Sequence, residues 1–293
     1  MRYRNFVTVN RNPTVRQRRL ARTLRQLRIQ SGQTIAMAAQ TLACAESKIS
    51  RIEGAQSGIR LVDLRLLLDS YGETDPEVRA RLEELSREGR RRGWWDRYSD
   101  DLMPTYADYI ALEADASEFC SVQPLLVPGL LQTEDYTRAV VRAQIPDAST
   151  ERVETLTKVR QERLSVLTRP QPLTVWVVLS EAVLRVEIGG PGVLRAQLRH
   201  LATMAEHPNV NLQILPQSSV VHAALFGPFV ILTFPEPFET DVVYVDSLLS
   251  TLYIEEPSEV AKYTALSRRV MAESLPYDKS LDLIESAAKG IKL

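Results

Sequence analysis

Residues 33–59, QTIAMAAQTLACAESKISRIEGAQSGI, constrain the fold of this chain more than any other stretch. Thr34 is placed to cap a first helix, because its hydroxyl can accept from the free N–H groups of the opening turn. The alanines and the leucine that follow recur at helical spacing and give an apolar stripe. Ala43-Cys44-Ala45 interrupts this pattern, and the helical period resumes at Glu46. The stretch therefore predicts a short helix, a tight turn and a second helix.

The second of these helices has two different faces. Ile49 and Ile52 face one way, and the other way face short or cationic side chains: Ser47, Lys48, Ser50 and Arg51. A helix that buries two isoleucines and presents hydrogen-bond donors outward fits the major groove of DNA, so we expect these four residues to contact base edges or nearby phosphates. An ordinary helical hairpin with a solvated polar face would give the same pattern.

The distribution of charge favours the nucleic-acid interpretation. Residues 1–60 contain twelve Lys or Arg and two acidic residues, a net charge of +10, whereas the whole chain carries −1 and its remainder −11. Such asymmetry is typical of a nucleic-acid contact. Residues 1–13 are expected to form a basic arm, and a disordered tail is an equal alternative for residues 1–12. We expect contacts to the DNA backbone from five residues: Arg16, Arg18, Arg19, Gln33 and Thr34.

Residues 14–72 resemble the helix-turn-helix domains of the Cro and phage-repressor superfamily, often called the xenobiotic-response-element (XRE) class. The resemblance rests on LRQLRIQSG at 24–32, the helix-turn-helix itself, and LVDLRLLLDSYG at 61–72. It implies a lambda-repressor-like, all-α DNA-binding domain whose second motif helix enters the major groove. It also implies a partly buried ion pair between Arg28 on the first helix and Glu53 at the end of the recognition helix.

The segment departs from the superfamily pattern at three positions. Ile35 replaces a glutamine that commonly contacts DNA, and Ala45 replaces a serine that commonly caps the recognition helix. Glu46 opens that helix, where it either complements the helix dipole or accepts from a cytosine amino group. These departures make the base preferences unreadable.

The chain of 293 residues is too long for one small domain. Asp75-Pro76-Glu77 is a strong helix start, and residues 73–93 are expected to form a solvated connecting helix. Trp94, Trp95 and Tyr98 follow at once, and bulky aromatics beside a junction usually pack two bodies together. Residues 94–293 would then form the second domain.

Residues 94–293 predict an α+β domain with a mixed, mostly antiparallel sheet. Helices are expected at 106–119, from the Thr133 cap to 144, and at 151–167, 192–206, 257–273 and 278–288, with an irregular apolar loop around VQPLLVPGLLQ. Strands are expected at 173–180, 210–216, 228–234, 241–247 and 251–256. The helix between the first two strands favours a parallel pair with a right-handed crossover, and the close spacing of the other three favours antiparallel pairing.

The second half also resembles a family of actinobacterial regulators, in which a repressor-type helix-turn-helix precedes a C-terminal domain of uncharacterised function. GWWDRYSD, VPGLLQTEDY, WVVLSEAVLR, GPFVILTFPEP and VVYVDSLLSTLYIEEP carry this resemblance. It implies a transcriptional regulator, in some members antitoxin-like and associated with a small protein encoded nearby.

The sequence gives little support to other classes of protein. Its longest apolar run, within 173–179, is too short to cross a bilayer, and the basic N-terminus lacks a hydrophobic signal segment. Two cysteines in different predicted domains indicate reduced thiols in the cytoplasm. The Gly189-Gly190-Pro191-Gly192 loop is interpreted as a turn that opens a helix, and His200 and His207 as ordinary histidines. We expect no catalytic site, metal or cofactor.

The sequence thus predicts a cytoplasmic DNA-binding transcriptional regulator, acting as a homodimer, whose acidic C-terminal domain binds a partner protein or a small ligand. One alternative is an antitoxin-like scaffold whose basic end binds an acidic partner protein. Another is a ligand-gated sensor, with a pocket lined by Trp94, Trp95 or Trp176.

Overall fold

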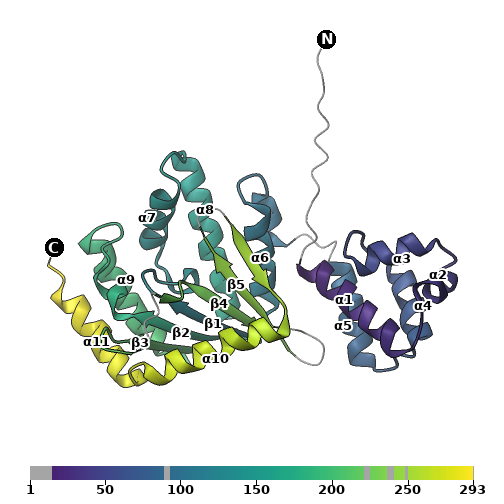
Figure 1. Cartoon of the computed structure of the whole chain (residues 1–293). Helices are drawn as coiled ribbons and strands as arrows, with labels where there is room; N and C mark the ends of the chain where they lie inside the picture. Colours follow the sequence, from purple (N-terminus) through teal and green to yellow (C-terminus); the bar gives the residue numbers. More distant parts are fainter. Residues whose placement is uncertain (1–14, 89–92, 221–224, 236–240, 248–249, 293) are drawn as a thin grey trace, which may run out of the picture. The chain divides into compact units, whose positions relative to one another are not determined.

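The computed structural model describes residues 15–88, 93–220, 225–235, 241–247 and 250–292 (Figure 1). The chain divides into two compact units, residues 1–93 and 94–293. The first is helical and the second is α+β, as predicted. The expected basic arm at residues 1–13 lies outside the described residues.

The N-terminal unit consists of five described helices: α1 (Val15–Gln30), α2 (Ile35–Thr41), α3 (Glu46–Glu53), α4 (Leu61–Tyr71) and α5 (Pro76–Glu88). The predicted cap of the first motif helix is present, since the Thr34 hydroxyl accepts from the Met37 N–H at 3.2 Å. Ala45, in contrast, caps α3 without a side-chain hydrogen bond. The helix-turn-helix predicted from the sequence corresponds to α2, the turn and α3.

The turn between α2 and α3 stores backbone strain. Ala43 adopts a φ of +47°, the left-handed region that side chains with a Cβ disfavour. Its N–H donates to the Gln40 carbonyl at 3.0 Å, and the Cys44 N–H donates to the Ala39 carbonyl at 3.0 Å. These bonds satisfy the end of α2 and redirect the chain into α3.

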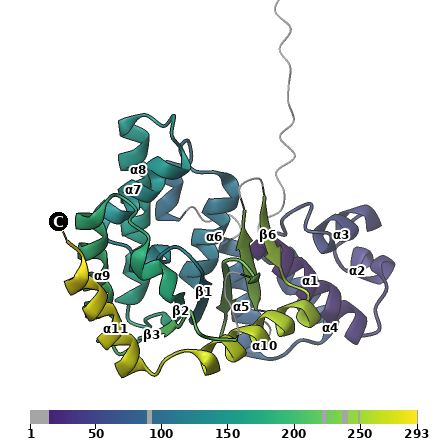
Figure 2. The ribbon, with the colours of Figure 1, turned by 60° about the vertical axis from the view of Figure 1, so that its left-hand side comes forward.

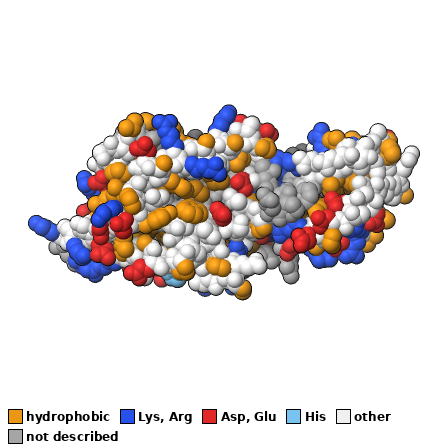
Figure 3. All heavy atoms as spheres, turned by 90° about the horizontal axis from the view of Figure 1, so that it is seen from below, with side chains coloured by type: hydrophobic (Ala, Val, Ile, Leu, Met, Phe, Trp, Pro, Cys, Tyr) orange, Lys and Arg blue, Asp and Glu red, His pale blue; other side chains and the backbone are white. Residues whose placement is uncertain are grey.

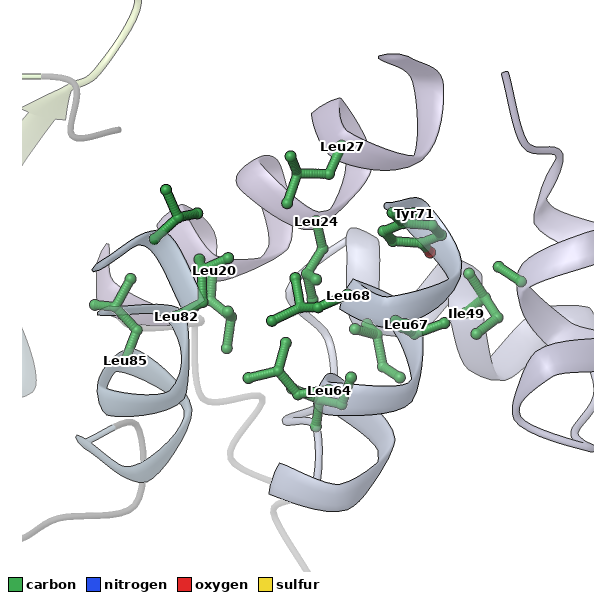
Figure 4. Packing of buried hydrophobic residues seen from close by; sticks show 14 of the residues in the cluster. Leu20, Leu24, Leu27, Ile49, Leu64, Leu67, Leu68, Tyr71, Leu82 and Leu85 are labelled. Atoms are coloured by element: carbon green, nitrogen blue, oxygen red, sulfur yellow. The ribbon is translucent and has the colours of Figure 1, made fainter. Parts of the chain in front are cut away.

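The helices of this unit share one hydrophobic core, in which leucines of α1, α4 and α5 meet Ile49 of α3 (Figure 4). Val78, Leu82 and Leu85 of α5 are at most 4% exposed and belong to this core. The segment expected to be a solvated connecting helix is therefore an integral part of the helical unit, because its apolar stripe completes the core. The predicted continuation of this helix through Arg90–Arg92 lies outside the described residues.

The C-terminal unit is built on a six-stranded mixed sheet with the order β3-β2-β1-β4-β5-β6. The strands are β1 (Glu118–Gln123), β2 (Thr174–Ser180), β3 (Val210–Leu215), β4 (Phe229–Thr233), β5 (Val242–Asp246) and β6 (Thr251–Ile254). The predicted parallel pairing of β2 with β3 and the antiparallel pairing of β4, β5 and β6 are confirmed.

Strand β1 corrects the sequence prediction. The sequence places Glu118 and Phe119 at the end of a predicted helix and Val122 and Gln123 in a predicted irregular loop, but all four belong to this strand. It lies at the centre of the sheet, parallel to β2 and antiparallel to β4. Its apolar residues are mixed with Cys120 and Ser121, so it gives only a weak strand pattern.

Helices complete the C-terminal unit: α6 (Pro104–Asp115), α7 (Glu134–Gln144), α8 (Thr150–Glu162), α9 (Pro191–Ala205), α10 (Pro257–Glu273) and α11 (Tyr277–Gly290), with 3₁₀ turns at Trp94–Tyr98, Gly129–Leu131, Arg163–Leu167 and Glu181–Arg185. The predicted Thr133 cap of α7 is present. Val260 and Val270 of α10 pack on one face of the sheet. Figures 1 and 2 show α7, α8 and α9 on the other side.

The VPGLLQT stretch at 127–133 is fixed by two buried glutamines. Gln132 donates from Nε2 to the Val127 carbonyl at 2.7 Å, and its Oε1 accepts from the Thr137 hydroxyl at 3.1 Å. Gln197 of α9 donates to the Leu131 carbonyl and accepts from the Thr133 N–H, both at 2.7 Å. Buried polar groups need such partners, so this stretch has a structural role in joining α7 to α9.

Candidate nucleic-acid interface

The outward face of α3 carries a stripe of hydrogen-bonding side chains. Ser47, Ser50 and Arg51 are exposed, whereas Ile49 and Ile52 on the opposite face are 1% and 2% exposed. With 3.6 residues per turn, the three exposed residues lie within about 100° of one another around the helix axis. This stripe, which we call the α3 stripe, can donate and accept hydrogen bonds without disturbing the core.

Arg51 lies against its own helix. Its Nε donates to the Ser47 carbonyl at 3.3 Å, four residues earlier. The long geometry makes this a weak bond that a better acceptor can replace. Arg51 and Ser47 are therefore neighbours within the α3 stripe.

Lys48 occupies a different position from the one expected. Its Nζ donates to Oδ2 of Asp63 on α4 at 2.9 Å, and its side chain is 35% exposed. Arg60, directly before α4, donates to the same carboxylate from Nη2 at 3.0 Å and from Nε at 3.3 Å. Burial alone would raise the pKa of Asp63, but the hydrogen bonds from Lys48 and Arg60 hold it below its ordinary value. The sequence reasoning missed Arg60 and Asp63, although their spacing of three at a helix start was a usable signal.

Arg28 and Glu53 form the ion pair expected from the superfamily resemblance. Arg28 donates from Nε to Oε1 at 2.7 Å and from Nη2 to Oε2 at 2.9 Å, and the two side chains are 10% and 7% exposed. Nη1 of Arg28 also donates to the Gln33 carbonyl at 2.8 Å. The pair therefore ties the end of α3 to α1 and to the segment that enters α2.

Gln33 and Thr34 differ in what they can offer to DNA. The side-chain amide of Gln33 donates to the carbonyl and the hydroxyl of Ser70 on α4, which joins α2 to α4. The Gln33 side chain is thus engaged within the unit, and its contact to the DNA backbone stays a prediction. Thr34 is exposed, and its hydroxyl hydrogen can still be donated while its oxygen caps α2.

The three arginines expected at the DNA backbone are not equivalent. Arg16 and Arg18 of α1 are half-buried, but Arg19 is only 6% exposed. Arg19 therefore offers less of its side chain to a partner than Arg16 and Arg18 do, and its contact to the DNA backbone stays a prediction.

Each of the two units matches a known protein family. Residues 19–82 match the family described as helix-turn-helix domain, which supports a DNA-binding regulator. Residues 106–286 match the family described as domain of unknown function DUF5753. The chain belongs to the DUF5753 family. No curated protein and no solved structure matches the chain.

In the DUF5753 unit, three of the aromatic residues expected at a domain junction or a ligand pocket, Trp94, Trp95 and Tyr98, pack together in one hydrophobic cluster. The Trp94 ring lies edge-on to Trp95 and Tyr98, with centroids 5.7 and 6.3 Å apart. Trp95 is 9% exposed and packs with Ile110 of α6 and Val159 of α8. This packing argues against a ligand pocket at Trp94 and Trp95. Trp176 is on β2 and is not a member of this cluster.

Several surface charges of the DUF5753 unit are paired with charges of the opposite sign. On the face shown in Figure 3, Lys and Arg lie next to Asp and Glu over both units. Arg138, for example, contacts Glu134, Asp135 and Glu154 at 2.7 Å each. Within the described ranges no three His, Cys, Asp or Glu residues are grouped as a metal site would require. Nor does any described helix combine the length and apolar character needed to traverse a membrane.

Proposed function

We propose that this protein is a sequence-specific transcriptional regulator whose α3 stripe reads base edges in the major groove of DNA. The observation that carries the proposal is that Ser47, Ser50 and Arg51 are exposed on one face of a helix whose other face is buried. Arginine pairs with guanine through two hydrogen bonds, and serine hydroxyls can contact several bases. Arg51 would supply most of the base discrimination.

The anchoring of α3 supports a reading role. Ile49 and Ile52 hold the helix in the core, and the Arg28–Glu53 pair fixes its end to α1. Base readout needs side chains held on a rigid element, because a small displacement breaks hydrogen bonds to the base edges. A helix fixed at its face and at its end meets this requirement.

Contacts to the phosphate backbone would come from residues outside α3. Thr34 at the start of α2 is exposed, and Arg16 and Arg18 stand at the start of α1. The excess of positive charge over residues 1–60 would add affinity that does not depend on sequence, because each neutralised phosphate releases counterions. Replacing Arg18 should then weaken binding to all sequences alike, and replacing Arg51 should act at particular bases.

The protein would act as a homodimer. A homodimer would place two copies of α3 about 34 Å apart, one turn of DNA, and would read a two-fold symmetric site. The DUF5753 unit would dimerise, bind a small ligand or dock a small partner protein. The acidic remainder of the chain, −11 over residues 61–293, would keep this unit away from phosphate.

A gel-shift titration of the purified protein against its own upstream region, with scrambled duplex as competitor, tests the proposal. We expect a complex that scrambled duplex displaces only at a large excess. Equal displacement by scrambled and specific duplex, or no complex at low ionic strength, would contradict it. The second outcome would favour the alternative in which the basic end binds an acidic partner protein.

A further inference from the structure

We propose that Asp63 is a positioning residue that gathers Lys48 and Arg60 into a two-cation site for a DNA phosphate beside the α3 stripe. The inference rests on the proposed function and deepens it, since it assigns Arg60 a DNA contact and Lys48 a phosphate contact in place of a base contact. The three residues are called the Asp63 cluster below.

In the Asp63 cluster a buried carboxylate binds one half-buried and one exposed cation. The side chain of Asp63 is 7% exposed, that of Lys48 is 35% exposed and that of Arg60 is 71% exposed. Both cations reach the same carboxylate, Lys48 at 2.9 Å and Arg60 at 3.0 Å. Because Asp63 lies in the first turn of α4, it holds the ends of two side chains from two segments together at the surface.

The charge balance of the cluster distinguishes it from a structural ion pair. Two cations share one carboxylate, so the cluster keeps a net charge of +1 at its exposed side. An ammonium has three N–H groups and a guanidinium five, and the bonds to Asp63 use one of the first and two of the second. The remaining N–H groups can serve a phosphate oxygen.

Arg28 gives the contrast within the same unit. Its bonds go to the Glu53 carboxylate and the Gln33 carbonyl, its side chain is 10% exposed, and its pair with Glu53 is neutral. Arg28 is therefore a structural cation. Arg60, with 71% of its side chain exposed, is held in place without being enclosed.

Helix geometry decides which part of DNA Lys48 meets. Lys48 is about 100° around the α3 axis from Ser47, on the flank that faces α4. A side chain on that flank, pulled towards Asp63, is directed away from the base edges that the α3 stripe would reach. The flank of a helix in the major groove faces the phosphate strand, which is the partner that a point charge such as a lysine ammonium suits.

Salt-dependent binding of the full-length protein to a short duplex from its own upstream region tests the two cations. Each lost phosphate contact lowers the slope of log K against log salt by about 0.9, which makes the fall in affinity from 50 to 200 mM salt about three- to fourfold smaller. We expect this change for R60Q and for K48Q. R65Q is the matched control, since Arg65 is on α4, is ion-paired to Glu83 and loses the same charge.

The variant D63N tests whether Asp63 positions Lys48 and Arg60 or only contributes a negative charge near the phosphate. If Asp63 only repels phosphate, removing its charge tightens binding and leaves the salt slope unchanged. If it positions the two cations, D63N weakens binding and lowers the slope, and adding R60Q to D63N has a smaller effect than R60Q alone. Circular dichroism establishes that D63N is folded at the assay temperature. If D63N is unfolded, the salt slopes of R60Q and K48Q, compared with that of R65Q, decide whether the two cations bind a phosphate.

The outcomes distinguish this inference from the function on which it rests. If R60Q and K48Q keep the salt slope of R65Q while the wild-type protein binds its duplex specifically, the Asp63 cluster is not a phosphate site and the regulator proposal stands. Tighter binding by folded D63N overturns the positioning role. If the wild-type protein shows no salt-dependent binding, the proposed function itself fails.

Discussion

Arg163 and Glu113 form a bidentate ion pair inside the DUF5753 unit, with Nε 2.8 Å from Oε1 and Nη2 2.6 Å from Oε2. Nη1 donates to the Tyr106 hydroxyl at 2.6 Å, and a Cβ on Gly129 would lie 3.2 Å from the same nitrogen. Although burial alone would lower the pKa of Arg163, the adjacent Glu113 holds it well above its ordinary value. This pair joins α6 to the 3₁₀ turn after α8 and leaves little room for a Cβ at position 129.

Replacing Arg163 with Met is expected to destabilise the DUF5753 unit by about 3–5 kcal/mol, because Glu113 would remain buried without its partner. Urea unfolding followed by tryptophan fluorescence measures the change, since all three tryptophans are in this unit: Trp94, Trp95 and Trp176. R185M is the control, because Arg185 is 69% exposed in its pair with Glu181 and should leave the midpoint unchanged. Equal midpoints for the two variants would contradict the account.

The Arg28–Glu53 pair should matter to the helical unit in the same way. Glu53→Gln leaves Arg28 without a carboxylate, and we expect a loss of about 3 kcal/mol in the unfolding free energy of that unit. Calorimetry measures it through the transition that tryptophan fluorescence does not report. A variant whose transition coincides with that of the wild type would show that the pair contributes little.

The strained turn before α3 gives a prediction of opposite sign. Ala43→Gly removes the cost of a left-handed alanine but makes the unfolded chain more flexible, so the net gain should be about 0.5–1 kcal/mol. Ala36→Gly, in the first turn of α2, should instead cost about 0.5 kcal/mol. The same calorimetric transition tests both, and a loss of stability in A43G would show that the turn is not strained.

Acid should weaken the helical unit through Asp63. A carboxyl whose pKa is lower in the folded state than in the unfolded state adds stability above its ordinary pKa, and this stability is lost as the pH falls through the folded value. The difference in melting temperature between wild type and D63N should therefore be largest at neutral pH and shrink below about pH 4. A difference that is constant from pH 7 to pH 3 would contradict the charged network at Asp63.

The sequence predicts structure best where a helical repeat of apolar residues follows a helix-capping residue. The helix-turn-helix follows from Thr34, from the alanine stripe and from Ile49 and Ile52, and the structure places these residues as the pattern requires. Strand β1 could not be predicted, because Glu118–Gln123 mixes polar and apolar residues and continues directly from a helical pattern. Only its pairing with β2 and β4, far away in sequence, makes it a strand.

The candidate site was harder to predict than the fold, because charge alone does not say which side of a helix a residue occupies. Arg19 has the same side chain as Arg18 but is buried by its position on α1. Lys48 is one of the four residues expected to contact base edges or nearby phosphates, yet its ammonium binds the carboxylate of Asp63 on α4, fifteen residues away in sequence. Tertiary partners of this kind have no local signature in the sequence.

Selection of bound DNA from a pool of randomised duplexes tests the central claim most directly. We expect the wild-type protein to enrich one motif, and the variant S47A/S50A/R51A to retain salt-dependent binding while enriching none. If the variant enriches the same motif as the wild type, or the wild type binds DNA without enriching any, the α3 stripe does not read sequence.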